Sequence, residues 1–362
     1  MSKIVITSDL HFGVAGRTTD ILWACRTIKE YCKTFGVDTV LILGDLFHDR
    51  QSLNIEVLSV VSRFFEEAAE AGQKWIAFPG NHDMFLRHSW EINSLTVLRK
   101  HLTVIEDIKL LMLDDHRFWV LPFITHEKSY MRVLHKLCKS VVEEGDSLLT
   151  HIGVCGATLN TCFLLENWNV VNFDDTPFKR IYTGHFHNKQ QLGERVWYPG
   201  SPIPFKFDEG DIGHGFYVLD LDEGEHKFIN IWKAGNKFLP NEKAPPQFCT
   251  FLDELLHEKT EEHVTNNMIR VALQRDYTQE EKRQIKDRLV LMGARGVRWM
   301  NLNQRMDKAV AVERIQTEHK DLFRAWYESD TSAKDLNKDI LFSIHNEVVV
   351  EGDELYALET AE

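Results

Sequence analysis

The sequence of 362 residues lacks the features that mark several classes of protein. It contains no run of about 18 apolar residues, so we expect no membrane-spanning helix and no membrane partner. The N-terminal residues do not join a basic region to a long apolar stretch, which argues against a secretory signal. Internal repeats and low-complexity tracts are also absent. Because the chain has 362 residues and 43% of them are hydrophobic, we expect a large core, and the length allows more than one domain.

Closely spaced cysteine pairs of the CxxC type are absent too. A chain of this length does not need a disulfide framework, so we expect reduced thiols that act as small buried apolar residues. This pattern indicates a cytoplasm-like compartment. The six scattered cysteines are Cys25, Cys32, Cys138, Cys155, Cys162 and Cys249.

Positive charge is in short supply, since the formal net charge is −13. A general nucleic-acid-coating protein would need a basic surface, and this composition argues against one. The imbalance is uneven, however. Residues 327–362 carry ten Asp and Glu against two Lys, so most of the excess lies there and a local cationic site elsewhere remains compatible with the sequence.

Several short apolar runs each end at a polar residue that could take part in chemistry. Continuous apolar runs of this length predict strands buried on both faces, and helical patterns lie between them. Such alternation indicates a layered α/β domain with a mixed sheet. In open α/β sheets, ligands bind just beyond the carboxyl ends of the strands. The runs end at Asp9, Asp45, Asn81, His151 and His185.

Further elements follow from periodicity and end signals. Helices are expected at 21–31, 55–69 and 131–142, and strands at 216–219 and 227–232. A Pro-rich boundary at 235–247 precedes a strand at 268–273, a helix that begins at a Thr278–Glu281 capping box, and a strand at 296–300. A mostly helical segment begins near Val310. We expect three domains, at 1–238, 264–304 and 310–362.

Seven residues in these runs form a candidate ligand set for two divalent cations. Two carboxylates, one amide oxygen and four imidazoles suffice, because one aspartate can bridge both ions. This N/O mixture suits manganese, iron or zinc better than calcium or magnesium. Two such ions can clamp a phosphate and lower the pKa of a bound water to about 7. The candidates are Asp9, His11, Asp45, Asn81, His151, His185 and His187.

Each motif alone is weak, because any single histidine is commonly a surface residue or a hydrogen-bonded core residue. Their combination, in this order and each ending an apolar run, is far more specific. Glycines precede three of the ligands, at Gly44, Gly80 and Gly184. A residue without a side chain permits sharp turns and close approach of the backbone to a metal or phosphate.

The ordered motifs resemble those of the calcineurin-like metallophosphoesterases and, within them, the SbcD nuclease family. The narrower resemblance depends on the motifs at 44–48, 184–187 and 197–202. Phosphoprotein phosphatases usually have Gly-Asp-x-Val-Asp-Arg at the second motif, whereas here His48 stands before Asp49, as in the nucleases. The resemblance covers residues 9–202 and is only architectural beyond Pro240.

This resemblance implies a four-layer α/β sandwich of mixed sheets flanked by helices, with a small α/β capping domain and a helical C-terminal segment. It assigns one metal to Asp9, His11, Asp45 and His187. It assigns the other to Asp45, Asn81, His151 and His185, so that Asp45 bridges. Manganese is the favoured ion, and magnesium, iron or zinc are possible.

Two histidines receive catalytic roles from the same resemblance. His82 would donate the proton to the leaving 3′ oxygen, and His48 would help to position the phosphate. The residues themselves agree, because the neighbouring Asp83 carboxylate can orient the imidazole of His82 and stabilise its protonated form. A solvated loop histidine is the alternative for His82, and a supporting hydrogen bond near the ligands is the alternative for His48.

The resemblance also implies partners. The family works with an SbcC-type ATPase of the structural-maintenance class, which the C-terminal segments at 322–327 and 340–344 could bind; packing on their own domain is the alternative. Homodimerisation is expected through 55–69 and 90–98, although both stretches could be ordinary core. A bacterial or phage-type protein of the cytoplasm is indicated. Given the acidic charge, we expect a partner to supply much of the DNA-binding surface.

Three functions follow. The first is a manganese-dependent DNA nuclease in repair or recombination, a 3′–5′ exonuclease on duplex ends and an endonuclease on single strands or hairpins. The second is a small-molecule or cyclic-nucleotide phosphodiesterase, which would need neither His48 nor the residues after Pro240. The third is a catalytically silent scaffold, against which the complete ligand set argues.

Overall fold

The computed structural model describes residues 3–86, 89–158, 170–209 and 213–302. Its first sheet is mixed, with β1 to β4 parallel and two antiparallel strands at one edge. The strand order places β1 and β2 in the interior, where runs such as that of β2 are buried on both faces. In order, the strands are β12 (His226–Asn230), β11 (Gly215–Asp220), β1 (Lys3–Thr7), β2 (Thr39–Ile42), β3 (Lys74–Ala77) and β4 (Thr103–Val104).

The second sheet is also mixed and has six strands. Its four interior strands are parallel, and an antiparallel strand closes each edge. In order, they are β5 (Lys109–Leu113), β6 (His116–Leu121), β7 (Ser147–His151), β8 (Arg180–Gly184), β10 (Val196–Tyr198) and β9 (Gln190–Leu192).

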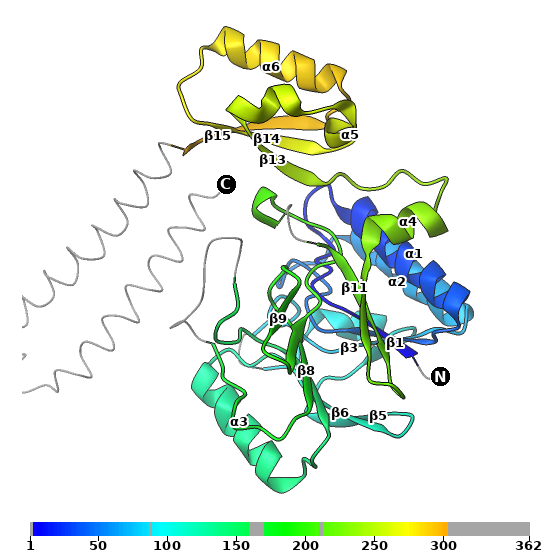
Figure 1. The fold of residues 1–362 in the computed structure, drawn as a ribbon. Helices are drawn as coiled ribbons and strands as arrows, with labels where there is room; N and C mark the ends of the chain where they lie inside the picture. Colours follow the sequence, from blue (N-terminus) through cyan, green and yellow to red (C-terminus); the bar gives the residue numbers. More distant parts are fainter. Residues whose placement is uncertain (1–2, 87–88, 159–169, 210–212, 303–362) are drawn as a thin grey trace, which may run out of the picture. The chain divides into compact units, whose positions relative to one another are not determined.

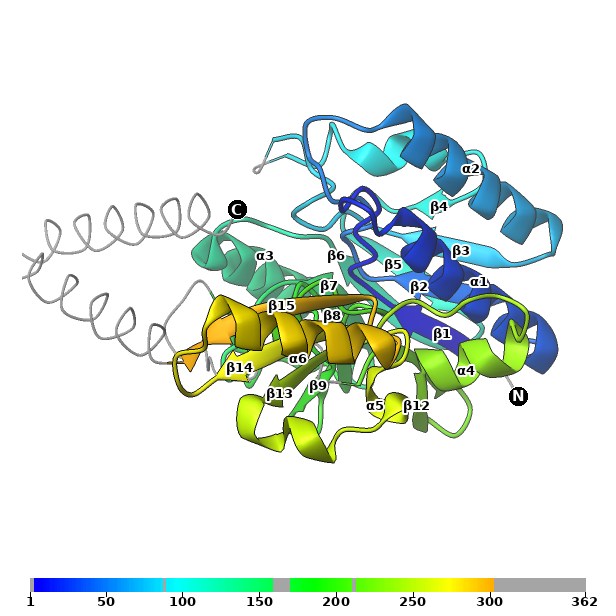
Figure 2. The same cartoon turned by 90° about the horizontal axis from the view of Figure 1, so that it is seen from above.

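Alternating side chains along the strands build separate cores on the two faces of each sheet. In β1, Val5 packs into the core beneath the helices, whereas Ile4 and Ile6 face a second core shared with Val120 and Leu149 of the other sheet. Figures 1 and 2 show α1 (Thr18–Phe35) and α2 (Ile55–Glu70) outside the first sheet, and α3 (Glu127–Ser140) outside the second.

The layers therefore run helix, sheet, sheet, helix. Three buried clusters correspond to them: one beneath α1 and α2, one between the sheets, and one beneath α3. The expected mixed α/β sandwich flanked by helices is confirmed, and the chain's three predicted early helices are present.

One predicted element is wrong at its end. Residues 227–232 were expected to form a single strand, but β12 stops at Asn230 and α4 (Ile231–Phe238) begins there. The Asn230 side chain accepts a hydrogen bond from the amide of Lys233 (3.1 Å) and thereby caps the helix. Gly235 of α4 packs against the ring of Trp23, where a β-carbon would have no room.

The chain divides into two compact units, residues 1–271 with 282–298 and residues 272–281 with 299–362. A three-stranded sheet is formed by β13 (Phe248–Leu252), β14 (Met268–Leu273) and β15 (Gly296–Asn301). Three short helices accompany it, η3 (Asp253–Glu258), α5 (Glu261–Val264) and α6 (Gln279–Leu291).

The predicted capping box at the start of α6 is present. Thr278 Oγ1 accepts from the amide of Glu281 (3.2 Å), whose carboxylate accepts from the amide of Thr278 (2.8 Å). The assignment of 264–304 as a capping domain stays a prediction. The predicted helical segment at 310–362 lies outside the described residues. Among the helices that are described, none is long and apolar enough to cross a lipid bilayer.

Candidate metal centre

The seven expected ligands gather where the carboxyl ends of the two sheets meet. Asp9, Asp45 and Asn81 lie on the loops after β1, β2 and β3. His151 ends β7, and His185 follows β8 directly. Because parallel strands deliver their carboxyl ends to one edge, residues far apart in sequence meet there.

The loops after β1 and β2 are held side by side by backbone hydrogen bonds. The amide of His11 donates to the carbonyl of Asp45 (3.0 Å), and the amide of His48 donates to the carbonyl of Phe12 (3.0 Å). The Asp9 carboxylate accepts a hydrogen bond from the amide of His185 (3.1 Å). This bond joins a loop of the first sheet to a loop of the second sheet. The ligands are thus placed by main-chain geometry and not only by their side chains.

Four of the ligands have left-handed backbone conformations. Asp9, His11 and Asp45 have φ near +50°, and His185 has φ +99°. Non-glycine residues adopt this region at a cost of about 1–3 kcal/mol each, and such strain is concentrated at functional sites. Only two other described non-glycine residues have positive φ, so the strained conformations of the described chain are concentrated in this centre.

The first group of ligands, which we name the His187 cluster, contains Asp9, His11, Asp45 and His187. The Nε2 atoms of His11 and His187 lie 3.0 Å apart. The Nε2 of His11 is 3.6 Å from Oδ2 of Asp45. Potential ligand atoms of Asp9, His11 and His187 all lie within 4.8 Å of one another.

The second group, which we name the Asn81 cluster, contains Asp45, Asn81, His151 and His185. The side-chain oxygen of Asn81 lies 3.0 Å from His151 Nε2 and 2.9 Å from His185 Nδ1. Oδ2 of Asp45 lies 3.4 Å from His151 Nε2. Asp45 therefore belongs to both clusters, as expected for a bridging carboxylate.

The hydrogen-bond polarity of these contacts fits cation binding. His151 Nδ1 donates to the carbonyl of Leu43 (2.7 Å), so when the ring is neutral its Nε2 presents a lone pair to the oxygens of Asn81 and Asp45. Acceptor atoms that converge in this way repel one another unless a proton or a cation supplies positive charge there. The donor set of four imidazoles, two carboxylates and one amide suits divalent transition-metal ions.

Burial and mutual charge perturb the ionisable groups of the centre. Burial raises the pKa of Asp9, whereas the nearby histidines hold the pKa of Asp45 well below its usual value despite burial. Burial lowers the pKa of His185 to about 3 and that of His11 well below 6.5. For His151, burial acts in the same direction, but Asp45 and Asp9 outweigh it and raise the pKa to about 9.

The two expected catalytic histidines lie together next to the His187 cluster. The rings of His48 and His82 are stacked, with centroids 5.4 Å apart and 12° between their planes, and both meet the ring of His11 edge-on. His82 Nδ1 donates to the carbonyl of His48 (2.7 Å), which leaves Nε2 available. Its amide donates to Oδ1 of Asp45 (2.8 Å).

Asp83 occupies a different place from the one its sequence position suggests. Its buried carboxylate accepts from the amides of Leu46 (3.3 Å), Phe47 (3.1 Å) and Gly80 (3.0 Å), and from the hydroxyl of Ser94 (3.2 Å). The ring of His82 is oriented instead by the His48 carbonyl. Asp83 therefore ties loops together beneath the centre. Burial and the charge of Asp45 raise its pKa to about 7.

The glycines before the ligands are required by crowding. Gly44 has φ +82°, and a β-carbon there would lie 2.5 Å from His151 Nδ1. At Gly80 a β-carbon would lie 2.3 Å from Oδ1 of Asp45, and Gly184 is equally crowded. These glycines therefore allow the backbone to lie close to the candidate ligand side chains, and close approach to a metal or phosphate stays a prediction.

Two residues beside the ligands were not found from sequence. Glu209 accepts from His187 Nδ1 (2.9 Å), and Phe123 stacks on the ring of His185 with centroids 5.9 Å apart. Glu209 follows the 197–202 motif by seven residues, so an acidic residue soon after that motif is the signal that could have found it. For Phe123 the sequence offers no comparable signal.

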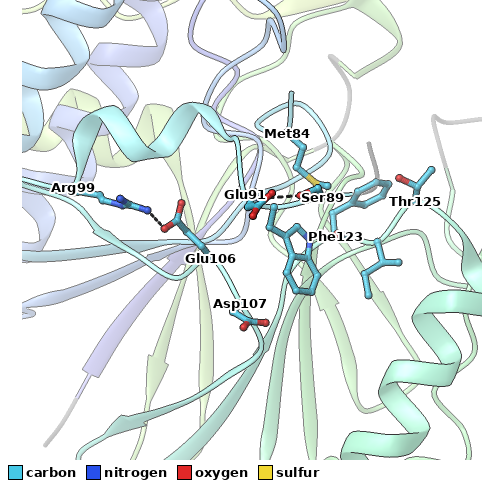
Figure 3. A pocket seen from close by; sticks show the side chains of 10 residues that line it. Met84, Ser89, Glu91, Arg99, Glu106, Asp107, Phe123 and Thr125 are labelled. Carbon is cyan, nitrogen blue, oxygen red and sulfur yellow. Dashed lines mark hydrogen bonds and ion pairs between the residues drawn. The ribbon is translucent and has the colours of Figure 1, made fainter. Parts of the chain in front are cut away.

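A cavity of about 630 Å³ adjoins this side of the centre, since Phe123 forms part of its wall. Figure 3 shows the carboxylates of Glu91, Glu106 and Asp107 along it, with Glu106 paired to Arg99. Its acidic lining disfavours a phosphate inside the cavity itself. The other lining residues are Met84, Ser89, Trp90, Ile124 and Thr125.

The model of the calcineurin-like phosphoesterase family matches residues 2–189, more than half of the chain. The chain therefore belongs to this family, whose members use divalent metal ions. All seven candidate ligands fall inside the matched region. The class that the fold and the centre define is a metallophosphoesterase.

Similar proteins have related names. The chain is 21% identical over 230 residues to a phosphoesterase of Invertebrate iridescent virus 6, covering 62% of the chain and 77% of the relative. It is 21% identical to exonuclease subunit 1 of Enterobacteria phage T4, and the match covers 63% of the chain and 67% of that relative. It is 24% identical to the DNA double-strand break repair protein Mre11 of Halobacterium salinarum, and the match covers 72% of the chain and 68% of that relative.

Proposed function

We propose that this metallophosphoesterase is a nuclease that hydrolyses phosphodiester bonds of DNA with two divalent cations, most favourably Mn²⁺. The stacked pair of His48 and His82 beside the His187 cluster carries the proposal. A DNA phosphodiester must expel an alkoxide, which needs a proton, and a histidine next to the metal centre can supply it. The relatives named for exonuclease activity and double-strand break repair support the same substrate.

The cations would be held by the His187 and Asn81 clusters, and when bound they supply charge neutralisation of the phosphate and activation of water. The chain's own residues provide orientation and proton transfer. His82, as the imidazolium, gives its Nε2 proton to the leaving oxygen. The ring is left as the neutral tautomer with its hydrogen on Nδ1, and this hydrogen is already donated to the His48 carbonyl.

His48 contributes position. The amide of His48 donates to the carbonyl of Phe12, and its ring lies nearly parallel to that of His82, so both imidazoles present themselves on one side of the His187 cluster. Because His48 is exposed while His11 beneath it is buried, its ring can contact a phosphate oxygen of a bound strand. The cavity beyond Phe123 leaves space for an uncharged substituent of the phosphodiester on the opposite side of the centre.

A protein partner belongs to the same proposal. The chain carries a net charge of −13, and phosphate backbones bind strongly only to basic surfaces. We propose an SbcC-like ATPase as the partner that supplies this surface, bound through the C-terminal segment. Its action would lie in DNA end processing during repair or recombination.

A homodimer is the second assembly that we propose. Much of the apolar content of α2 and of 90–98 is explained by the core, since Phe64, Phe65 and Leu95 are buried. Ile55 and Val97 on the same two stretches are nevertheless 83% and 54% exposed. These exposed apolar residues support an interface there.

The test is cleavage by the purified chain of labelled duplex and hairpin DNA, with Mn²⁺ or Mg²⁺, beside the small ester bis-p-nitrophenyl phosphate. We expect cleavage of both kinds of substrate with Mn²⁺. Cleavage of the small ester alone, with and without the ATPase, would favour a small-molecule phosphodiesterase. Loss of all activity with metal bound would indicate a silent scaffold.

A further inference from the structure

The carboxylate of Glu209, in the short helix η2 (Phe207–Glu209), lies directly behind His187. Its Oε1 is 2.9 Å from His187 Nδ1, and the residue is only 7% exposed. A buried carboxylate is costly unless its oxygens are hydrogen-bonded. Both oxygens of Glu209 are, which makes this a built contact within the described structure.

The direction of the hydrogen bond can be assigned from the second oxygen. Oε2 of Glu209 accepts from the backbone amides of Phe205 (2.7 Å) and Lys206 (3.3 Å). An ionised carboxylate, whose two oxygens only accept, satisfies all three contacts at once, and His187 Nδ1 then carries the hydrogen. The lone pair of His187 is thereby fixed on Nε2, the atom that lies 3.0 Å from His11 Nε2.

The same stretch of chain also holds the backbone of His187. The amide of Ser201 donates to the His187 carbonyl (3.0 Å). Gly200, at φ +71°, lies so close that a β-carbon would be 2.5 Å from that carbonyl oxygen. The ring of His214 lies between the carbonyls of Ser201 and Glu209, 2.8 Å from each, and links the two contacts.

We propose that Glu209 is the positioning residue of the His187 cluster: it fixes the tautomer and orientation of His187 so that Nε2 can bind a cation. Carboxylates behind a metal-binding histidine act in this way, and their removal lowers metal affinity about 10- to 100-fold. The Asn81 cluster has no contact with Glu209, so its affinity is not affected. The proposal rests on the two-metal centre of the proposed function but not on the identity of the phosphodiester.

Glu209→Gln tests this inference with little change of shape. A glutamine has one acceptor oxygen, whereas the site needs two, because three N–H groups point at the carboxylate. If the oxygen remains with the two backbone amides, the NH₂ group faces His187 Nδ1. His187 must then move its hydrogen to Nε2, which removes the lone pair from the cluster.

The measurement is Mn²⁺ binding by titration calorimetry and electron paramagnetic resonance, without DNA. Glu194→Gln, an exposed residue between β9 and β10, is the matched control. We expect two sites in both proteins, one of which is weakened about 10- to 100-fold in Glu209→Gln while the other stays within about twofold. Nitrogen-15 NMR of the histidines should show one ring changing from the Nδ1–H to the Nε2–H tautomer.

Two results would overturn the proposal. One is unchanged affinity at both sites together with unchanged tautomers. The other is an equal loss at both sites, because it would indicate a general disturbance of the fold. Metal affinity is measured here without substrate. A chain that binds Mn²⁺ as expected but does not cut DNA would therefore refute only the nuclease assignment, and the proposed role of Glu209 would stand.

Discussion

At the scale of single residues, His151 shows how the centre is prepared for cations. Its Nδ1 is committed to the carbonyl of Leu43, and its Nε2 faces Asp45. The carboxylates of Asp45 and Asp9 raise its pKa to about 9, whereas burial keeps His185 neutral with a pKa of about 3. In the metal-free protein, a proton on His151 therefore takes the position that a cation must occupy.

We predict that metal binding releases protons. The folded pKa of His151, about 9, lies above the usual histidine value of 6.5, so the proton stabilises the metal-free protein below pH 6.5 and this contribution is lost as pH rises through 9. Metal affinity should rise with pH across the same window. Calorimetry at pH 7.5 in two buffers of different ionisation enthalpy should show release of about one to two protons. Identical heats in the two buffers would contradict this assignment.

A second residue-scale prediction concerns Asp83. Asp83→Ala would leave three buried amides and one hydroxyl without their acceptor. Relief of repulsion from Asp45 offsets part of the loss, so we expect a free energy of unfolding lower by about 2–4 kcal/mol. Urea denaturation measures it, with the exposed Asp115→Ala as control. Equal stability of the two variants would show that Asp83 does not brace the loops.

At the scale of elements, much of the phosphoesterase part could be predicted. Strands such as 39–42, buried on both faces, give continuous apolar runs, and their carboxyl ends give the ligand positions. The end of β12 could not be predicted, because Ile231 and Trp232 are apolar and only the cap at Asn230 reveals the helix. Local pattern cannot distinguish a buried strand from a buried helical turn.

Contacts between distant elements were also beyond the sequence. Asp83 stands next to His82 in the chain, which suggested an Asp–His pair, yet its carboxylate turns to the loop after β2. Glu209 is 22 residues from His187 and meets it only because the 197–209 stretch folds back over the centre. Residue type and spacing identify candidate ligands at strand ends, but they do not show which groups support those candidates.

At the scale of the whole molecule, the net charge bears on how the proposed DNA substrate would bind. The centre can attract phosphate when cations are bound, but the chain as a whole is acidic. We predict that the isolated chain binds duplex DNA weakly and that the proposed ATPase partner increases the affinity. Filter binding across a salt series measures this. Salt-sensitive nanomolar binding by the isolated chain would contradict it.

We propose that this molecule's two-metal centre cleaves DNA with His82 as the proton donor to the leaving oxygen. The most direct measurement compares His82→Ala with His135→Ala, an exposed histidine of α3, on DNA and on bis-p-nitrophenyl phosphate. A nitrophenolate can leave without receiving a proton, whereas the alkoxide that leaves from DNA needs one. We predict that His82→Ala loses about 10²- to 10⁴-fold in DNA cleavage while it retains most activity on the small ester, and that His135→Ala keeps both. An equal loss of activity on the two substrates, or unchanged DNA cleavage by His82→Ala, would contradict the role of His82 as proton donor.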